Sequence, residues 1–193
     1  MIQRCTIVII KKGGVRVLKY TNGYEGDLTK EFQRIAYDPF YKYYWRSGAH
    51  PAQPYEEDKQ DNCITMVSVD KHSGDLLGLL TYTVDECVRS VIGISAISFS
   101  KKPNVIFSRD LYKFLADIFV FRKLNKINWW VAVGNPIEKS YDKLAKRYGG
   151  RIVGTFDADV LTYDGQLLPK KYYEITRESF EKTLDSHKKP MVH

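Results

Sequence analysis

Residues 88–99 read VRSVIGISAISF, and residues 107–124, which follow closely, read FSRDLYKFLADIFVFRKL. The first run, rich in β-branched and small residues, predicts a strand, and the second has apolar residues along one continuous helical face. A second buried strand is predicted by NWWVAVG at residues 128–134. A helix between two strands provides the right-handed crossover that a parallel pair requires. We therefore expect residues 88–99 and 128–134 to lie beside each other and parallel in one sheet.

The sequence on both sides of this unit predicts an α/β (α+β) fold with a mixed, mostly antiparallel sheet and flanking helices. Further strands are expected over residues 6–10, 15–20, 64–69, 76–84, 151–155 and 172–177, and further helices over residues 28–36, 136–148 and 177–184. Asp27 and Ser108 are expected to act as N-caps of the helices that follow them.

Length and composition indicate one globular domain. The chain has 193 residues, of which 44% are hydrophobic and 27% charged. We expect a single domain over residues 1–185 and a flexible tail over residues 186–193. No apolar run approaches the roughly 18–20 residues needed to span a bilayer, and the N-terminus does not resemble a signal peptide.

Three cysteines and four histidines bear on compartment and metal binding. Cys5, Cys63 and Cys87 are odd in number and far apart, which favours reduced thiols in a cytoplasmic protein. The histidines show no ligand spacing with the cysteines, so no metal site is expected.

Positive charge is concentrated in the middle of the chain. Residues 101–151 contain twelve Lys or Arg and four Asp or Glu, a net charge of +8, whereas the whole chain has +7. Such an excess attracts polyanions, either the phosphates of a cofactor or a nucleic-acid backbone. The alternative is two solvated helix faces with no ligand.

The order strand, helix, strand, helix, strand, strand is used by few folds. Residues 134–154, GNPIEKSYDKLAKRYGGRIVG, provide the second helix and the strand after it, and residues 163–180 provide a closing hairpin. Residues 64–180 together resemble the core of the GCN5-related N-acetyltransferases (GNAT family), in which a thioester cofactor sits between two splayed parallel strands. The resemblance implies acetyl-CoA or another acyl-CoA as cofactor.

The resemblance fails at the glycine loop with which the family binds pyrophosphate. Residues 101–110, KKPNVIFSRD, contain no glycine, and the proline removes one N–H donor. Four side chains are expected to replace the lost backbone donors: Lys101, Lys102, Ser108 and Arg109. The family pattern also implies thioester-polarising N–H groups at Ile97, Ser98 and Phe99, and a cofactor contact from Asn135.

The resemblance implies a tyrosine on the second helix as proton donor for the leaving thiolate. Ala145 occupies the family's tyrosine position, and Tyr141 lies one turn earlier on the same face. Tyr141 is therefore the expected donor. Glu86, just before the first core strand, is the candidate general base, unless it is an ordinary turn residue and a water relay serves instead.

Residues 37–46, YDPFYKYYWR, combine six aromatic side chains with two cations. In the GNAT family the corresponding segment covers the acceptor site, and aromatic faces interleaved with cations suit a flat substrate or a base. Tyr41, Tyr44, Trp45 and Arg46 are therefore candidate substrate contacts. The alternative is a hydrophobic clasp that seals the segment onto the sheet.

Two classes of function follow. The first is an N-acyltransferase acting on a small-molecule, protein or nucleic-acid amine. The second is a divergent protein of this fold that modifies or binds nucleic acid, as in the DNA-modification proteins of Mu-like phages, which also resemble this fold. A scaffold without catalysis is a third possibility.

Overall fold

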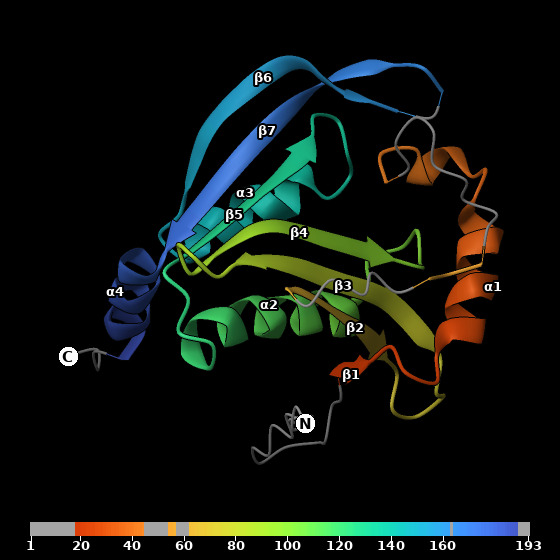
Figure 1. Cartoon of the computed structure of the whole chain (residues 1–193), viewed down its shortest axis with the longest axis horizontal. Coiled ribbons are helices and arrows are strands. Elements are labelled where there is room, and N and C mark those ends of the chain that lie inside the picture. Colours follow the sequence, from red (N-terminus) through yellow and green to blue (C-terminus); the bar gives the residue numbers. More distant parts are fainter. Residues whose placement is uncertain (1–17, 45–53, 57–61, 163, 189–193) are drawn as a thin grey trace, which may run out of the picture.

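The computed structural model describes residues 18–44, 54–56, 62–162 and 164–188. Within these residues one seven-stranded sheet runs in the order β1-β2-β3-β4-β5-β7-β6, with helices against both faces (Figure 1). The elements in chain order are β1 (Leu18–Tyr20), α1 (Glu25–Ile35), the 3₁₀ helix η1 (Pro39–Tyr41), β2 (Cys63–Val69), β3 (Leu76–Asp85), β4 (Ser90–Ser98), α2 (Val105–Val120), β5 (Lys126–Ala132), α3 (Glu138–Arg147), β6 (Arg151–Leu161), β7 (Leu167–Thr176) and α4 (Arg177–Lys188).

The predicted parallel pair is confirmed. β4 and β5 are parallel, α2 connects them, and every other neighbouring pair in the sheet is antiparallel. The order of the described elements also matches the prediction. The strand expected at residues 6–10 lies outside the described residues, as do residues 15–17 of the strand expected at residues 15–20, whose remainder is β1.

The two predicted N-caps are wrong, and local hydrogen bonding explains one of them. The Asn104 side-chain oxygen accepts a hydrogen bond from the Phe107 N–H at 3.0 Å, so α2 begins at Val105 and Ser108 lies in its first turn. α1 begins before Asp27 and has no side-chain cap hydrogen bond. α4 continues past Ser186 into the expected tail.

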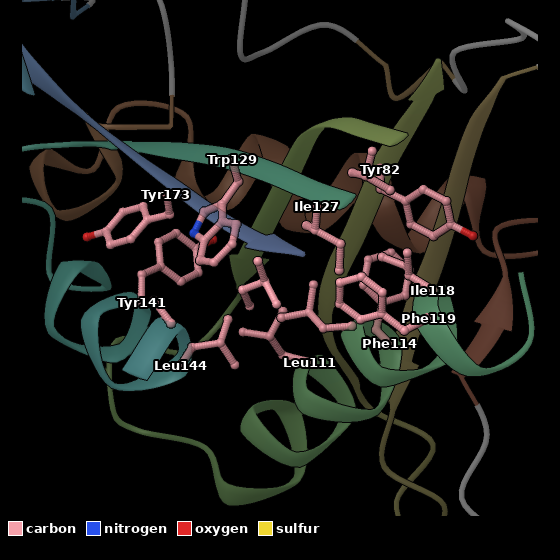
Figure 2. Packing of buried hydrophobic residues seen from close by; sticks show 14 of the residues in the cluster. Tyr82, Leu111, Phe114, Ile118, Phe119, Ile127, Trp129, Tyr141, Leu144 and Tyr173 are labelled. Carbon is pink, nitrogen blue, oxygen red and sulfur yellow. The ribbon is translucent and has the colours of Figure 1, made fainter. Parts of the chain in front are cut away.

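The sheet divides the core into two clusters. One lies against α2, α3 and α4 and includes Leu111, Ile118, Leu144 and Trp129 (Figure 2). The other lies under α1 and its members include Phe32. Full burial of such side chains contributes roughly 1.5–3 kcal/mol each, so α2 and α3 are held firmly against one face. No helix of the described residues is long and apolar enough to cross a membrane.

Asp117 on α2 gives a pH-dependent prediction. Burial raises the pKa of its carboxyl to about 6, against the attraction of Lys113. The folded protein therefore keeps a proton that the unfolded chain releases above about pH 4, and this stability is lost as the pH rises through 6. We expect Asp117→Asn to raise the free energy of unfolding by about 1 kcal/mol at pH 8 and by much less at pH 4. Denaturant unfolding at both pH values measures this, and an equal gain at both would contradict it.

Candidate active site between two splayed strands

The opening in the sheet begins where β4 and β5 stop pairing. Their parallel register contains only Ser90 opposite Lys126 and Val91 opposite Ile127, at the start of both strands. Both strands continue for several residues beyond these pairs and diverge (Figure 1). The second half of β4 therefore faces β5 across a gap.

The β4 backbone has a defined orientation at this gap. The Phe99 N–H donates to the Leu77 carbonyl of β3 at 3.0 Å. Because backbone groups alternate along an antiparallel strand, the Ile97 N–H also points to β3, and those of Ala96 and Ser98 point into the gap. Of the three predicted thioester-polarising groups, only Ser98 has this orientation. Ala96 was missed, and the β3–β4 register is the signal that identifies it.

Tyr141 on α3 packs under β5 and β7 with two aromatic neighbours. Its ring makes edge-to-face contacts with Trp129 of β5, at 5.9 Å between centroids, and with Tyr173 of β7, at 6.1 Å. The side chain is only 4% exposed, and burial raises the pKa of its hydroxyl above the ordinary value. Tyr141 therefore holds its proton throughout the neutral range, as a proton donor must.

The predicted phosphate-binding side chains lie just before α2 and in its first turns, and they are not equivalent. Lys101 forms an ion pair with Asp38 at 2.5 Å, and this contact lowers the pKa of the Asp38 carboxyl. Lys102 and Ser108 are exposed, and Arg109 is half-buried on the first turns of α2. Lys101 would have to exchange its carboxylate partner for a phosphate.

Serine hydroxyls take up some N–H groups of the loop between β4 and α2. The Ser98 hydroxyl accepts from the Ser100 N–H at 3.3 Å, and the Ser100 hydroxyl accepts from the Lys102 N–H at 3.2 Å. Val105 and Ile106, in the first turn of α2, have N–H groups directed out of the helix end. The residues present therefore fit a diphosphate through one helix end and nearby cations, rather than through a glycine loop.

Asn135 shapes the turn between β5 and α3. Its side-chain oxygen accepts a hydrogen bond from the Ile137 N–H at 3.1 Å. One oxygen of Glu138 accepts from the Gly134 N–H at 2.9 Å, and the other binds Lys171 of β7 at 3.0 Å. These contacts fix the start of α3, and Tyr141 with it, relative to β5 and β7.

The aromatic segment after α1 contacts β4 and the turn that follows β5. Burial raises the pKa of the Tyr44 hydroxyl, against a hydrogen bond with the Ser95 side chain of β4. The Tyr43 hydroxyl lies at the end of β5, 3.4 Å from where a Cβ on Gly134 would be. Tyr41, one of the predicted substrate contacts, is buried in the cluster under α1. Its burial fits the alternative, in which the segment is a hydrophobic clasp that seals onto the sheet.

The same segment also reaches the β6–β7 turn. The Lys42 ammonium donates to the Gln166 side chain at 2.8 Å and lies 3.6 Å from the Asp164 carboxylate. Trp45 and Arg46, the other two predicted contacts, lie outside the described residues. The segment around η1 thus bridges β4, the β5–α3 turn and the β6–β7 turn.

Glu86 does not lie at the gap. It is in the β3–β4 turn, where it lines a separate cavity of about 370 Å³ with Arg89 and Arg122. β4 has nine residues, and at about 3.3 Å per residue its two ends lie roughly 26 Å apart. Neighbouring Asp85 stabilises this turn by accepting from the Cys87 N–H at 2.9 Å. The general-base role of Glu86 therefore stays a prediction that its position in this turn does not support.

No protein-family model and no curated protein matches this sequence. Solved structures do match the fold. The spermidine N-acetyltransferase from Vibrio cholerae, in complex with CoA and spermine, matches with a TM-score of 0.66 and 18% identity over 86% of this chain and 98% of that chain. A probable acetyltransferase matches with a TM-score of 0.64 and 17% identity over 84% of this chain and 92% of that chain. The chain therefore has the fold of the GCN5-related N-acetyltransferases.

Proposed function

We propose that this protein transfers an acyl group from an acyl-CoA thioester to an amine, within a single domain over residues 1–185. The observation that carries the proposal is the gap itself. Inward-facing N–H groups of Ala96 and Ser98 border it on one side, and the buried phenol of Tyr141 packs under β5, the strand on its other side. Similarity to acetyltransferase structures, one of them bound to CoA, supports the same reading.

Each group has a role that follows from its chemistry. A bound acyl-CoA would supply the acyl carbon and a sulfur leaving group. The Ala96 and Ser98 N–H groups would donate to the acyl oxygen, where negative charge would develop as the amine nitrogen bonds to the acyl carbon. Tyr141 would give its proton to the sulfur as the carbon–sulfur bond breaks, the neutral amine would lose one proton to water, and the Tyr141 phenolate would regain one proton from water. Proton and electron-pair transfers then balance.

The η1 segment is the proposed entrance for the acceptor amine. It contacts β4 through Tyr44 and the β5–α3 turn through Tyr43, so it covers the gap on the α1 side. Spermine, present in the Vibrio cholerae structure, is the first acceptor to test, with spermidine and lysine-containing peptides. Among these, the sequence and structure favour no single acceptor.

Calorimetry with acetyl-CoA and CoA tests the proposal directly. We expect both to bind at a single site, with dissociation constants on the order of micromolar. Release of free thiol in the presence of the amine panel then measures turnover. If neither acetyl-CoA nor CoA binds, the proposed function is overturned. An oligonucleotide that competes with CoA would favour the nucleic-acid alternative.

The basic residues at the start of α2 give a salt-dependent prediction. We expect replacement of Lys101, Lys102 and Arg109 by alanine to weaken CoA binding about tenfold and to flatten its dependence on salt. Lys102→Ala alone should cost more than Lys101→Ala, because Asp38 already pairs with Lys101. Calorimetry at several salt concentrations measures both effects.

The matched control for Lys101→Ala is Lys182→Ala on α4, an exposed lysine that is likewise paired with a carboxylate, that of Glu178. An unchanged salt slope in the triple variant would mean that these cations form only a solvated surface.

A further inference from the structure

β6 forms one edge of the sheet and is exposed along most of its length. It pairs only with β7, and no element of the described residues lies beyond it (Figure 1). Its exposed side chains include Ile152, Val153 and Phe156, each at least half exposed. Proteins commonly protect an edge of this kind with lysine, proline or other charged residues, because it can pair with another strand. Residues 152–156, IVGTF, contain none of these.

The backbone of this edge has hydrogen-bonding groups that β7 does not use. The Val133 N–H, just after β5, donates to the Pro169 carbonyl of β7 at 2.9 Å, so the odd-numbered residues of this part of β7 bond to β5. Thr155 is paired with one of them, Lys171, so the N–H and carbonyl of Thr155 point away from β7. Val153 lies in a bulge and has no partner on β7.

The two ends of this stretch carry opposite charges. Arg151 is at the start of β6 and largely exposed, and Asp157 is exposed where the pairing with β7 is interrupted. Two N–H groups of the Arg151 guanidinium bind Glu174 of β7, and an arginine has five such donors. Asp159 pairs with Lys170, whereas Asp157 forms no ion pair within the described residues. A cation with spare donors and an unpaired carboxylate are therefore present on the same edge.

We propose that β6 pairs antiparallel with β6 of a second copy of this chain, around a two-fold axis at Gly154. Arg151 of each copy then lies opposite Asp157 of the other, since both residues are three positions from the axis. Opposite charges that face each other directly stabilise a strand pair, and like charges destabilise it. The axis forms this contact twice, which is the self-complementarity that a two-fold interface requires.

The same register also matches the residues between these charges. Ile152 lies opposite Phe156, so two exposed apolar side chains meet. Val153 lies opposite Thr155, and these are the two residues whose backbone groups β7 leaves unused. β5 and β7 separate this edge from the second half of β4, so a dimer formed here leaves the gap open. The inference does not depend on the proposed function.

Sedimentation velocity at a series of protein concentrations tests the pairing. One pair of edge strands is a small interface, so we expect a reversible dimer with a dissociation constant on the order of micromolar. Asp157→Arg brings two arginines opposite each other at both contacts and should weaken the dimer about tenfold or more. Combining it with Arg151→Asp exchanges the two charges and should restore most of the affinity. Asp75→Arg, in the exposed turn between β2 and β3, is the matched control for net charge and should have no effect.

A lysine on the edge provides a second, independent variant. Val153→Lys places a charge within the strand pair and should weaken the dimer about tenfold or more. Val88→Lys is the matched control, because Val88 is 57% exposed, against 55% for Val153, and lies in the β3–β4 turn. Circular dichroism and thermal unfolding check that each variant keeps the fold.

Three results would overturn this inference. The first is a chain that stays monomeric well above micromolar concentration. The second is a dimer that Asp157→Arg and Val153→Lys leave intact, because another surface would then join the copies. The third is a charge exchange that does not restore the affinity, since the register around Gly154 would then be wrong. None of these measurements needs a cofactor, so their failure leaves the proposed function standing.

Discussion

Tyr141→Phe is expected to lower turnover on the order of 100-fold or more while leaving CoA binding nearly unchanged. Phenylalanine keeps the edge-to-face contacts with Trp129 and Tyr173, so the core under β5 and β7 is preserved. Only the hydroxyl is lost, and with it the proposed proton for the departing sulfur. Steady-state kinetics and calorimetry on the same preparation measure the two quantities.

The pH profile adds a second expectation for Tyr141. Because burial raises the pKa of this hydroxyl above its ordinary value near 10, the donor stays protonated at and above neutral pH. Deprotonation of Tyr141 should therefore not lower the wild-type rate between pH 7 and pH 9. If the wild-type rate falls in this range and the fall is absent from Tyr141→Phe, the Tyr141 hydroxyl is not buried as described.

Tyr148→Phe is the matched control at the C-cap of the same helix. Tyr148 packs against Phe180 at 5.2 Å, with the Arg147 guanidinium 6.0 Å from its ring, away from the gap. Its substitution should change turnover less than twofold. Full activity in Tyr141→Phe would remove the proton-donor role and leave Tyr141 as a core residue.

The parallel pair and its crossover could be predicted because the apolar spacing of α2 identifies it as a helix with one buried face. A helix between two strands is the connection that a parallel pair requires. The orientation of the β4 N–H groups could not, since it depends on the register with β3, which a single strand does not encode. That is why Ile97 and Phe99 were chosen and Ala96 was missed. Glu86 was considered because it is close in sequence to β4. The two ends of an extended strand lie far apart, however, so closeness to one end says nothing about closeness to the other.

The unpaired indole N–H of Trp129 could not be predicted from the sequence either, and the reason is different. In NWWVAVG it reads as one more apolar residue of a buried strand, and the ring is indeed buried. Only the three-dimensional surroundings show that its N–H lacks an acceptor. The cap of α2 is a similar case: Asn104 and Ser108 are both good N-cap residues, and the structure, not the pattern, decides between them.

Gly78→Ala is expected to lower the free energy of unfolding by about 2–3 kcal/mol. A Cβ at this position of β3 would lie 2.3 Å from the Ile97 carbonyl oxygen and 2.4 Å from the Phe107 ring. The oxygen belongs to the β4 backbone, and Phe107 is buried, so neither can move without shifting β4 or the start of α2. Both elements border the proposed cofactor site, and CoA affinity should fall together with stability.

Gly93→Ala on β4 is the matched control for this effect. A Cβ there meets no atom within 4 Å, and neither glycine has a positive φ, so the two substitutions differ in space rather than in backbone freedom. Gly93→Ala should change stability by less than about 0.5 kcal/mol. Equal stabilities for the two variants in denaturant unfolding would mean that β3, β4 and α2 are not packed as closely as described. That packing fixes the end of β4 and the start of α2. It therefore also fixes where the cations at the start of α2 lie relative to the gap.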